Sequence, residues 1–495
     1  MASSVLVADR IPSILASGGA APARRHGAPR GRIHWSHERA EPTGRVSGTL
    51  LHELPGILAE GRLQARAALD GARAAAAPLE EAPRGRLIHG DNFEALARLV
   101  VEAEAEAGDG RGRAKLVYLD PPFDSKADYR SRILTQDDAG RRRALELHAY
   151  SDRWAGGTAR YLRMLVPRLV LARELLAADG AICVHVDWHS SHWVRVVLDE
   201  VFGREHFVNC LVWSYRSGGA SRTTSVPRKH DDLLLYRRSE RFRVNPLYER
   251  QYLDKPFMGS RTDGQGRHVV DTILRDVLEG GLTLVDGDAV RELGVRPVLN
   301  LSAERTGYAT QKPEGLLEVV LRWTTAAGDL VVDPFGGSGT TAVVADRLRR
   351  RWASVDVGDR AQAVARSRLD AAGAEYRCLA QGPAAEGAAD YDWDGRRFSL
   401  RGVGVALPDR APLGPARGED AAAAASIREG SGLGTLAGWH LWLGGRRLLG
   451  AWRDARGGLG TEATAAGPVA SATTLELIDL TGGRSVVEIP APPSG

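Results

Sequence analysis

Residues 329–341 read DLVVDPFGGSGTT, and this stretch decides the fold of the chain. The apolar run 329–333 predicts a strand, and the helical pattern that begins near Thr340 predicts a helix. Glycines at the turn between them let the backbone approach a ligand, while the helix N-terminus offers free N–H groups to a carboxylate or a phosphate. Asp333, at the strand end, would meet a positive group or a hydroxyl. Such a turn alone can also be nothing more than a tight turn.

A second acidic residue, Asp356, ends the strand predicted within 351–357, where it can accept hydrogen bonds from ribose hydroxyls. Further short apolar runs lie at 86–91, 115–120, 181–187, 209–213 and 232–238, and helical patterns alternate with them. The pattern predicts an α/β fold with a largely parallel, doubly wound sheet. One intervening helix covers 159–180, and we expect Gly180 to end it.

Composition limits the function classes only loosely. The chain has 495 residues, and 66 basic minus 62 acidic residues gives a net charge of +4, so any basic patch has to be found locally. Cys183, Cys210 and Cys378 are far apart and show no metal-ligand spacing. We therefore expect a reduced, cytoplasmic protein with no membrane segment and no metal.

A second motif, Asp120-Pro121-Pro122-Phe123, follows the strand predicted at 115–119. An exocyclic amine of adenine or cytosine needs acceptors that hold its two hydrogens when its nitrogen is methylated. The Asp120 carboxylate and the Pro121 carbonyl can supply them, and Phe123 can stack on a base taken out of the duplex. The competing interpretation is a rigid turn with Phe123 in the core.

Together the two motifs resemble the β-class amino-methyltransferases, which modify DNA at adenine N6 or cytosine N4 and include the type III restriction-modification Mod subunits. As in that class, the catalytic motif precedes the cofactor motif, which implies a circularly permuted Rossmann-like sheet. The resemblance covers about residues 84–370, with His89-Gly90-Asp91-Asn92 before the catalytic strand and Thr310-Gln311-Lys312-Pro313 before the glycine turn.

The resemblance implies S-adenosylmethionine as cofactor. It places Asp91 near the adenine, Asp356 at the ribose, and Thr310 and Lys312 at the carboxylate. The remaining cofactor-binding candidates are Gln311, Asp333, Phe335, Gly336, Gly337, Ser338, Gly339, Thr340 and Thr341. Asp124, where the family often has Asn, adds a negative charge beside the catalytic motif.

The expected reaction is direct methyl transfer to double-stranded DNA, and the Asp that begins the catalytic motif favours adenine N6. The alternatives are a cytosine-N4 enzyme, an RNA or protein methyltransferase, and a non-catalytic DNA-binding subunit; the late glycine turn disfavours a Rossmann oxidoreductase. By resemblance a homodimer and a restriction subunit are candidate partners.

Basic residues interleaved with Trp213, Tyr215 and Tyr236 predict a DNA-binding surface, although an ordinary solvated face has the same composition. The DNA-binding candidates are Arg216, Arg222, Arg228, Lys229 and His230. We divide the chain into an N-terminal extension (1–83), a catalytic half (84–240), a target-recognition insertion (241–300), a cofactor half (301–380) and a C-terminal region (385–495). In the last, we expect short strands with Trp439, Trp442 and Trp452 in a small core.

Overall fold

The computed structural model describes residues 49–75, 84–106, 113–136, 141–216, 226–287, 289–299 and 302–380. Within 385–491 it describes all residues except 387–388, 395, 404–412, 416–432, 444–445, 455–456, 467, 470 and 472. The chain divides into two units, residues 1–48, which lie outside these ranges, and a second unit that begins at Thr49. In the described ranges, no helix combines the length and the apolar character needed to cross a membrane.

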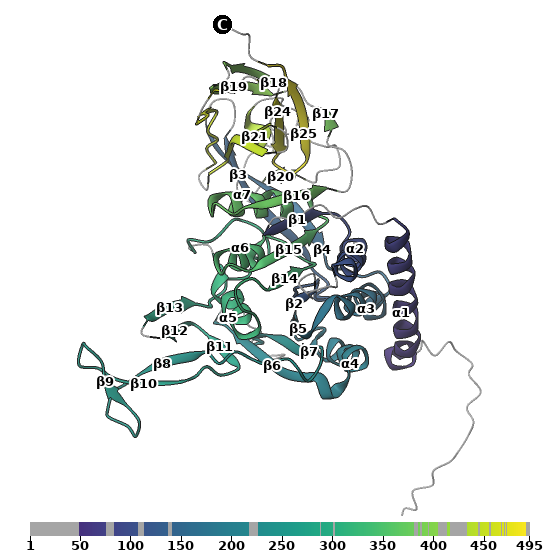
Figure 1. Cartoon of the computed structure of the whole chain (residues 1–495), viewed down its shortest axis with the longest axis vertical. Coiled ribbons are helices and arrows are strands. Elements are labelled where there is room, and N and C mark those ends of the chain that lie inside the picture. Colours follow the sequence, from purple (N-terminus) through teal and green to yellow (C-terminus); the bar gives the residue numbers. More distant parts are fainter. Residues whose placement is uncertain are drawn as a thin grey trace, which may run out of the picture. The chain divides into compact units, whose positions relative to one another are not determined.

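A nine-stranded sheet forms the centre of the second unit (Figure 1). Its strand order is β11-β6-β7-β5-β2-β14-β15-β1-β16, and only β7 runs antiparallel to its neighbours. In this order the strands are Val277–Glu279, Phe207–Ser214, His230–Arg237, Leu176–Val186, Ala114–Leu119, Leu330–Asp333, Arg351–Asp356, Gly85–His89 and Tyr376–Ala380. Catalytic strand β2 thus lies beside cofactor strand β14, which confirms the permuted, doubly wound sheet.

Helices cover both faces of this sheet (Figure 1). Along β2, Val117 and Leu119 pack towards one helical layer, while Leu116 and Tyr118 pack towards the other. The first layer holds α1 (Leu50–Ala74), α2 (Asn92–Ala105), α3 (Gly157–Leu175) and α4 (Ser191–Phe202). The second holds α5 (Glu314–Thr324), α6 (Thr340–Arg347) and α7 (Asp359–Ala371). Burial on both faces explains why the strands read as nearly continuous apolar runs.

The expected end of the helix at Gly180 is wrong. Helix α3 ends at Leu175, and Gly180 lies inside β5. Residues 176–178 continue an apolar helical pattern, but Leu176 pairs with Ala114 of β2, so sheet pairing overrides local propensity. A side chain at position 180 would overlap the carbonyl oxygen of Ala114, which gives this glycine a packing role instead.

The segment 241–300, which sequence alone shows only as a polar interruption, contains a separate five-stranded sheet of order β13-β12-β8-β10-β9. Its strands are Ala289–Gly294, Gly281–Asp286, Tyr248–Leu253, His268–Ile273 and Arg261–Thr262. Strand β11 from the same segment joins the central sheet instead, where it pairs with β6.

A two-stranded arm follows the catalytic motif directly. It consists of β3 (Asp128–Gln136) and β4 (Arg142–Ser151), and β20 (Leu413–Pro415) from the C-terminal region pairs with β4. The arm connects the catalytic loop to a region that lies far from it in sequence.

The C-terminal region is rich in β structure, as predicted. A five-stranded sheet contains β17 (Ala385–Glu386), β21 (Leu436–Leu443), β22 (Arg446–Trp452), β24 (Thr473–Asp479) and β25 (Arg484–Ile489). A three-stranded sheet contains β18 (Ala389–Trp393), β19 (Arg397–Val403) and β23 (Glu462–Thr464). Trp439 is fully buried against Phe398, with ring centroids 4.8 Å apart, so the core interpretation holds for this tryptophan. Trp442 and Trp452 are half-buried.

Candidate functional site

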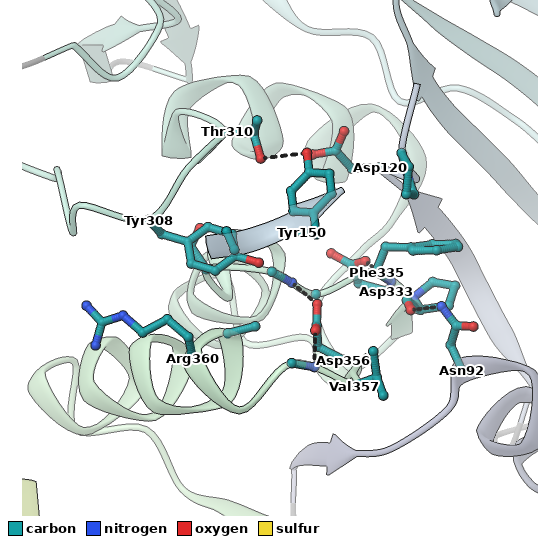
Figure 2. A pocket seen from close by; sticks show the side chains of 18 of the residues that line it. Asn92, Asp120, Tyr150, Tyr308, Thr310, Asp333, Phe335, Asp356, Val357 and Arg360 are labelled. Carbon is teal, nitrogen blue, oxygen red and sulfur yellow. Dashed lines mark hydrogen bonds between the residues drawn. The ribbon is translucent and has the colours of Figure 1, made fainter. Parts of the chain in front are cut away.

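A pocket of about 570 Å³ lies at the carboxyl ends of β1, β2, β14 and β15 (Figure 2). Parallel neighbouring strands deliver their ends to one edge of the sheet, so residues from distant parts of the sequence meet there. Most of the predicted cofactor and catalytic residues line the pocket: Asp91, Asp120, Pro122, Thr310, Lys312, Asp333, Phe335, Gly336, Gly337, Ser338, Thr340, Thr341 and Asp356.

The glycine turn allows a close approach of backbone to backbone. A side chain at Gly336 would overlap the Ser354 hydroxyl of β15, and Gly339, with φ of 75°, precedes α6 and lies against Ala365 of α7. The Gly337 N–H donates to the Asp356 carboxylate at 2.8 Å. The turn is therefore fixed to the neighbouring acidic strand end, and residues larger than glycine would separate them.

Two buried carboxylates face this turn. Burial raises the pKa of Asp333 to about 7, although the Thr341 hydroxyl and the Phe335 N–H, which donates at 3.0 Å, act in the opposite direction. Burial likewise raises the pKa of Asp356, against hydrogen bonds from the Gly358 and Gly337 N–H groups. Burial destabilises the ionised form of both carboxylates. A ligand that brings hydroxyl donors or positive charge would stabilise that form.

Asp152, a residue that sequence reasoning missed, holds the catalytic loop. Its carboxylate accepts hydrogen bonds from the N–H groups of Phe123, Asp124 and Ser125 at 2.8 to 3.0 Å. The Ser125 hydroxyl and the Trp154 indole N–H also donate to it, at 2.7 and 3.0 Å. Asp152 is fully buried, so these five donors fix the loop that starts at Asp120.

The negative charge of Asp124 does not face the pocket, whose lining it does not join. Asp124 is buried in the left-handed conformation, with φ of 59°, and the Thr158 hydroxyl of α3 donates to its carboxylate at 2.7 Å. The side chain thus binds the start of α3. Asp124 stands where the β-class often has Asn, but its carboxylate does not add charge to the pocket.

Lys312 forms an ion pair with Asp120, the first residue of the predicted catalytic motif. Its Nζ atom is 2.7 and 2.6 Å from the two carboxylate oxygens of Asp120 and 5.0 Å from the centre of the Phe123 ring. The contact of Lys312 with the cofactor carboxylate stays a prediction, and Lys312 also lines the pocket. Thr310 lines the pocket and its hydroxyl lies 3.4 Å from that of Tyr150, whereas Gln311 binds the loop around Thr306.

Phe123 lies on a buried polar chain. Its ring stacks on His185 with centroids 5.9 Å apart, and His185 binds the Tyr118 hydroxyl at 2.8 Å and the Asp231 carboxylate at 3.1 Å. The Tyr215 hydroxyl donates to the other Asp231 oxygen at 2.8 Å. These contacts fix one face of Phe123 beside Asp120.

The aromatic residues that the sequence places in a DNA-binding surface are not exposed together. Trp213 and Tyr236 are buried core residues and Tyr215 is half-buried, so the interleaved aromatics do not form an open stacking surface. Arg237 pairs with Glu240, as expected of an ordinary solvated face. This correction follows from β6 and β7 being central strands whose alternate side chains enter the core.

The basic candidates themselves lie apart. Arg216 is 92% exposed and pairs with Glu279, while the guanidinium of Arg228 lies 3.8 Å from the ring centre of Trp188, just after β5. His230 lies 3.9 Å from Asp232, and Lys229 beside it is half-buried. Arg222 lies outside the described residues. Arg228 lies over Trp188, which is 41% exposed and follows β5, the strand that pairs with β2.

Several further pocket residues were not predicted, among them Asn92, Tyr150, Tyr308, Arg360 and Thr481. The Asn92 amide donates to the Pro334 carbonyl at 2.7 Å and so joins the segment after β1 to the glycine turn. Tyr308 precedes the Thr310 segment closely enough for sequence to have suggested it. For Tyr150 and Thr481 no sequence signal exists, because only the folded arm and C-terminal region bring them to the pocket.

Comparison with known proteins places this site in context. Residues 114–367, just over half of the chain, match the sequence profile of the DNA methylase family of N6 and N4 enzymes. The type II methyltransferase M.EcaI of Enterobacter cloacae is 28% identical over 320 residues, covering 54% of this chain and 66% of that protein. The EcoP15I Mod subunit of Escherichia coli, a type III restriction-modification protein, is 27% identical over 164 residues, covering 31% and 24%.

Among solved structures, the complex of M1.HpyAVI with S-adenosylmethionine is similar over 58% of this chain and all of that chain, at 15% identity and a TM-score of 0.32. PvuII cytosine-N4 methyltransferase is similar over 59% and 90%, at 17% identity and a TM-score of 0.36. Membership of the DNA methylase family supports S-adenosylmethionine, the cofactor that the sequence predicts. From the profile match over residues 114–367, the chain belongs to the DNA methylase family whose members methylate N6 or N4 amino groups.

Proposed function

We propose that this chain transfers a methyl group from S-adenosylmethionine to the N6 amine of adenine in double-stranded DNA. The observation that carries the proposal is the position of Asp120, whose carboxylate lines the cofactor pocket and is held by Lys312 beside the Phe123 ring. An acceptor, a flat apolar ring and a cofactor pocket at one edge of the sheet are what methylation of an exocyclic amine requires.

The pocket residues fit the cofactor. Asp356 supplies a buried acceptor for ribose hydroxyls, and the close turn at Gly336 and Gly337 leaves room for a ligand against the backbone. By the resemblance, Asp333 and the loop after it would hold the methionine half and Asp91 would lie near the adenine; all of them, with Asn92, line the pocket. When bound, the cofactor supplies a methyl group on a positively charged sulfonium, which is already a good leaving group.

The residues of the chain then act by positioning. Asp120 accepts a hydrogen bond from the target amine, and this bond keeps the nitrogen lone pair directed at the methyl group. Asp120 then receives the proton that the methylated amine releases. Lys312 holds the Asp120 carboxylate in place, and the carboxylate retains free acceptor sites when one ammonium group binds it. Phe123, supported by His185, stacks on the extruded base.

The choice of adenine over cytosine rests on the Asp at position 120, because the resemblance associates Asp with adenine enzymes and Ser with cytosine enzymes. Cytosine N4 is the second candidate, since the same acceptor geometry suits either amine. We assign residues 241–300 to target recognition because they follow the last strand of the catalytic half in the sequence. We assign the Arg228–Trp188 pair to DNA contact because Trp188 follows β5, the neighbour of β2 in the sheet.

Substitution of the catalytic acid tests the proposal. We expect Asp120→Ala to bind S-adenosylmethionine with unchanged affinity in calorimetry and to lose methyl transfer to DNA by at least about 100-fold. Full transfer activity in this variant contradicts the assignment. Transfer to RNA with none to DNA would reassign the substrate, and cofactor binding without transfer by the unmodified protein would favour a non-catalytic subunit.

A further inference from the structure

The turn between β24 and β25, residues 480–483, belongs to the wall of the cofactor pocket. Thr481 lines the pocket together with Asp356, Val357 and Arg360, although it lies far beyond the residues 114–367 that match the family profile. A part of the chain outside the family domain therefore contributes a side chain to the site.

Buried charges bind the C-terminal sheet to α7. The Arg366 guanidinium of α7 donates to the two carboxylate oxygens of Glu476 on β24, at 3.0 and 2.6 Å, and both side chains are nearly inaccessible to solvent. Further along α7, the Trp452 indole N–H donates to Asp370 at 2.7 Å. Buried, charge-paired contacts of this kind demand one specific geometry, so they fix the C-terminal sheet on the helix that follows Asp356.

An apolar cluster binds the same sheet to the catalytic arm. Residues of β3 and β4 pack against residues of the C-terminal region and of α7. The cluster contains Ile133, Leu145, Leu147, Ala363, Ala437, Ile478 and Leu480. The C-terminal region thus joins the arm that follows the catalytic loop to the helix that follows the cofactor strand.

The turn itself has a defined shape and fits tightly. The Asp479 carboxylate accepts hydrogen bonds from the N–H groups of Thr481 and Gly483, at 2.7 and 3.1 Å, and from the Thr481 hydroxyl at 2.6 Å. Gly482 adopts a φ of 99°, and any side chain there would overlap the Asp359 carbonyl at the start of α7. The turn is therefore seated directly on the first peptide of this helix.

The first turn of α7 carries groups that face the pocket (Figure 2). The Gly358 N–H donates to Asp356 at 2.8 Å, which holds this carboxylate at the strand end. Arg360 lines the pocket, and its buried Nε atom has no hydrogen-bond partner among the described residues. A displacement of the turn would move both groups.

We propose that the C-terminal region completes the cofactor site, with Thr481 contacting the nucleoside half of S-adenosylmethionine and Gly482 holding Asp356 and Arg360 in their binding positions. The nucleoside half is assigned because Gly482, next to Thr481, lies against the Asp359 peptide, and the adjoining Gly358 N–H holds Asp356. The C-terminal region is then an obligatory part of cofactor binding and not only an appendage.

Calorimetric titration without DNA tests this inference. The probes are S-adenosylmethionine and 5′-methylthioadenosine, which retains the nucleoside and lacks the amino-acid half. We expect Gly482→Ala to weaken binding of both probes by at least about 10-fold, and Thr481→Val by about 3- to 10-fold, with Thr481→Ser close to the unmodified protein.

Matched controls separate contact from backbone strain. Gly373→Ala introduces a side chain at the other end of α7, where φ is also positive and no atom lies within 4 Å. Thr474→Val removes a hydroxyl from β24 that binds Glu488 at the surface. Both controls should keep full affinity.

Unchanged affinity for both probes in folded Gly482→Ala and Thr481→Val proteins would overturn the proposal, as would an equal loss in the controls. If Gly482→Ala fails to fold, the Thr481→Val and Thr481→Ser pair decides. The result does not depend on which base is methylated, because DNA is absent from the titration.

Discussion

The Nζ atom of Lys312 bridges both carboxylate oxygens of Asp120, at 2.7 and 2.6 Å, across 192 positions of sequence. Lys312 precedes helix α5 in the predicted cofactor half, whereas Asp120 follows strand β2 in the predicted catalytic half. The ion pair therefore joins the two halves of the permuted sheet at the place where methyl transfer would occur.

Removal of this ammonium group should impair transfer more than cofactor binding. We expect Lys312→Met to lower kcat by about 10- to 100-fold, because Asp120 loses the group that orients its carboxylate in a partly buried site. Labelled methyl transfer to DNA and calorimetry with S-adenosylmethionine measure the two effects. Lys115→Met, which breaks the surface pair with Asp179, is the control and should keep normal kcat. A large loss of cofactor affinity with normal kcat would contradict this expectation and would support the predicted contact of Lys312 with the cofactor carboxylate.

Asp152 should affect both the catalytic loop and stability. We expect Asp152→Asn to lower kcat by about 100-fold and stability by about 1–3 kcal/mol, because an amide cannot accept all the donors that the buried carboxylate accepts. Steady-state kinetics and urea unfolding provide the measurements. Asp128→Asn changes an exposed acid of β3 that pairs with Arg153 and should leave both quantities unchanged. Normal kcat in Asp152→Asn would show that the loop does not need this anchor.

Asp333 should make stability depend on pH. Its pKa in the folded protein, about 7, lies above the ordinary value of 3.8, so the folded state retains a proton that the unfolded chain loses. Stability from this group is therefore lost as pH rises from about 4 through 7. Asp333→Asn has no such proton. We expect its free energy of unfolding, relative to that of the unmodified protein, to rise by about 1–3 kcal/mol from pH 5 to pH 8.

Urea unfolding at the two pH values measures this difference, and calorimetry should show weaker S-adenosylmethionine binding by the variant at both. A stability difference that stays constant with pH would contradict the raised pKa.

The Arg366–Glu476 pair should be important for stability. Burial alone would raise the pKa of Glu476. Hydrogen bonds and the charges of Arg366 and Arg484 lower it by more than burial raises it, so the net pKa is below its ordinary value. The stabilisation is therefore present above about pH 5 and is lost in acid. We expect Glu476→Gln to cost about 3–5 kcal/mol at pH 7, because buried Arg366 loses its counter-charge.

Thermal melting measures this cost. Glu488 is an exposed residue of β25, so Glu488→Gln is the control and should have the melting temperature of the unmodified protein. Equal melting temperatures of Glu476→Gln and the unmodified protein at pH 7 would show that the pair contributes no net stability.

Sequence predicted the central fold because its determinants are local. Apolar runs, the glycine turn at 336–339 and the acids Asp120, Asp333 and Asp356 each have a signal within a few residues, and parallel strands bring those ends together. The permutation was predicted from the resemblance to the β-class, whose motif order this chain shares. The end of α3 was wrong because the pairing of Leu176 with Ala114 is a tertiary effect with no local signal.

The rest of the site depends on contacts over long distances in sequence. Asp152 is an ordinary acid in the sequence, and only the return of β4 along β3 brings it under the catalytic loop. Thr481 reaches the pocket only because Glu476 and its neighbours bind α7. Basic and aromatic residues at 213–243 suggested DNA contact, but composition cannot show which of them a central strand buries.

The most direct test of the account is methyl transfer from labelled S-adenosylmethionine to unmodified double-stranded DNA, followed by mass analysis of the nucleosides, with Asp120→Ala in parallel. The account predicts labelled N6-methyladenine with the unmodified protein and none with Asp120→Ala. Labelled N4-methylcytosine would contradict the choice of base, and absence of label from DNA despite measured cofactor binding would contradict the proposed reaction.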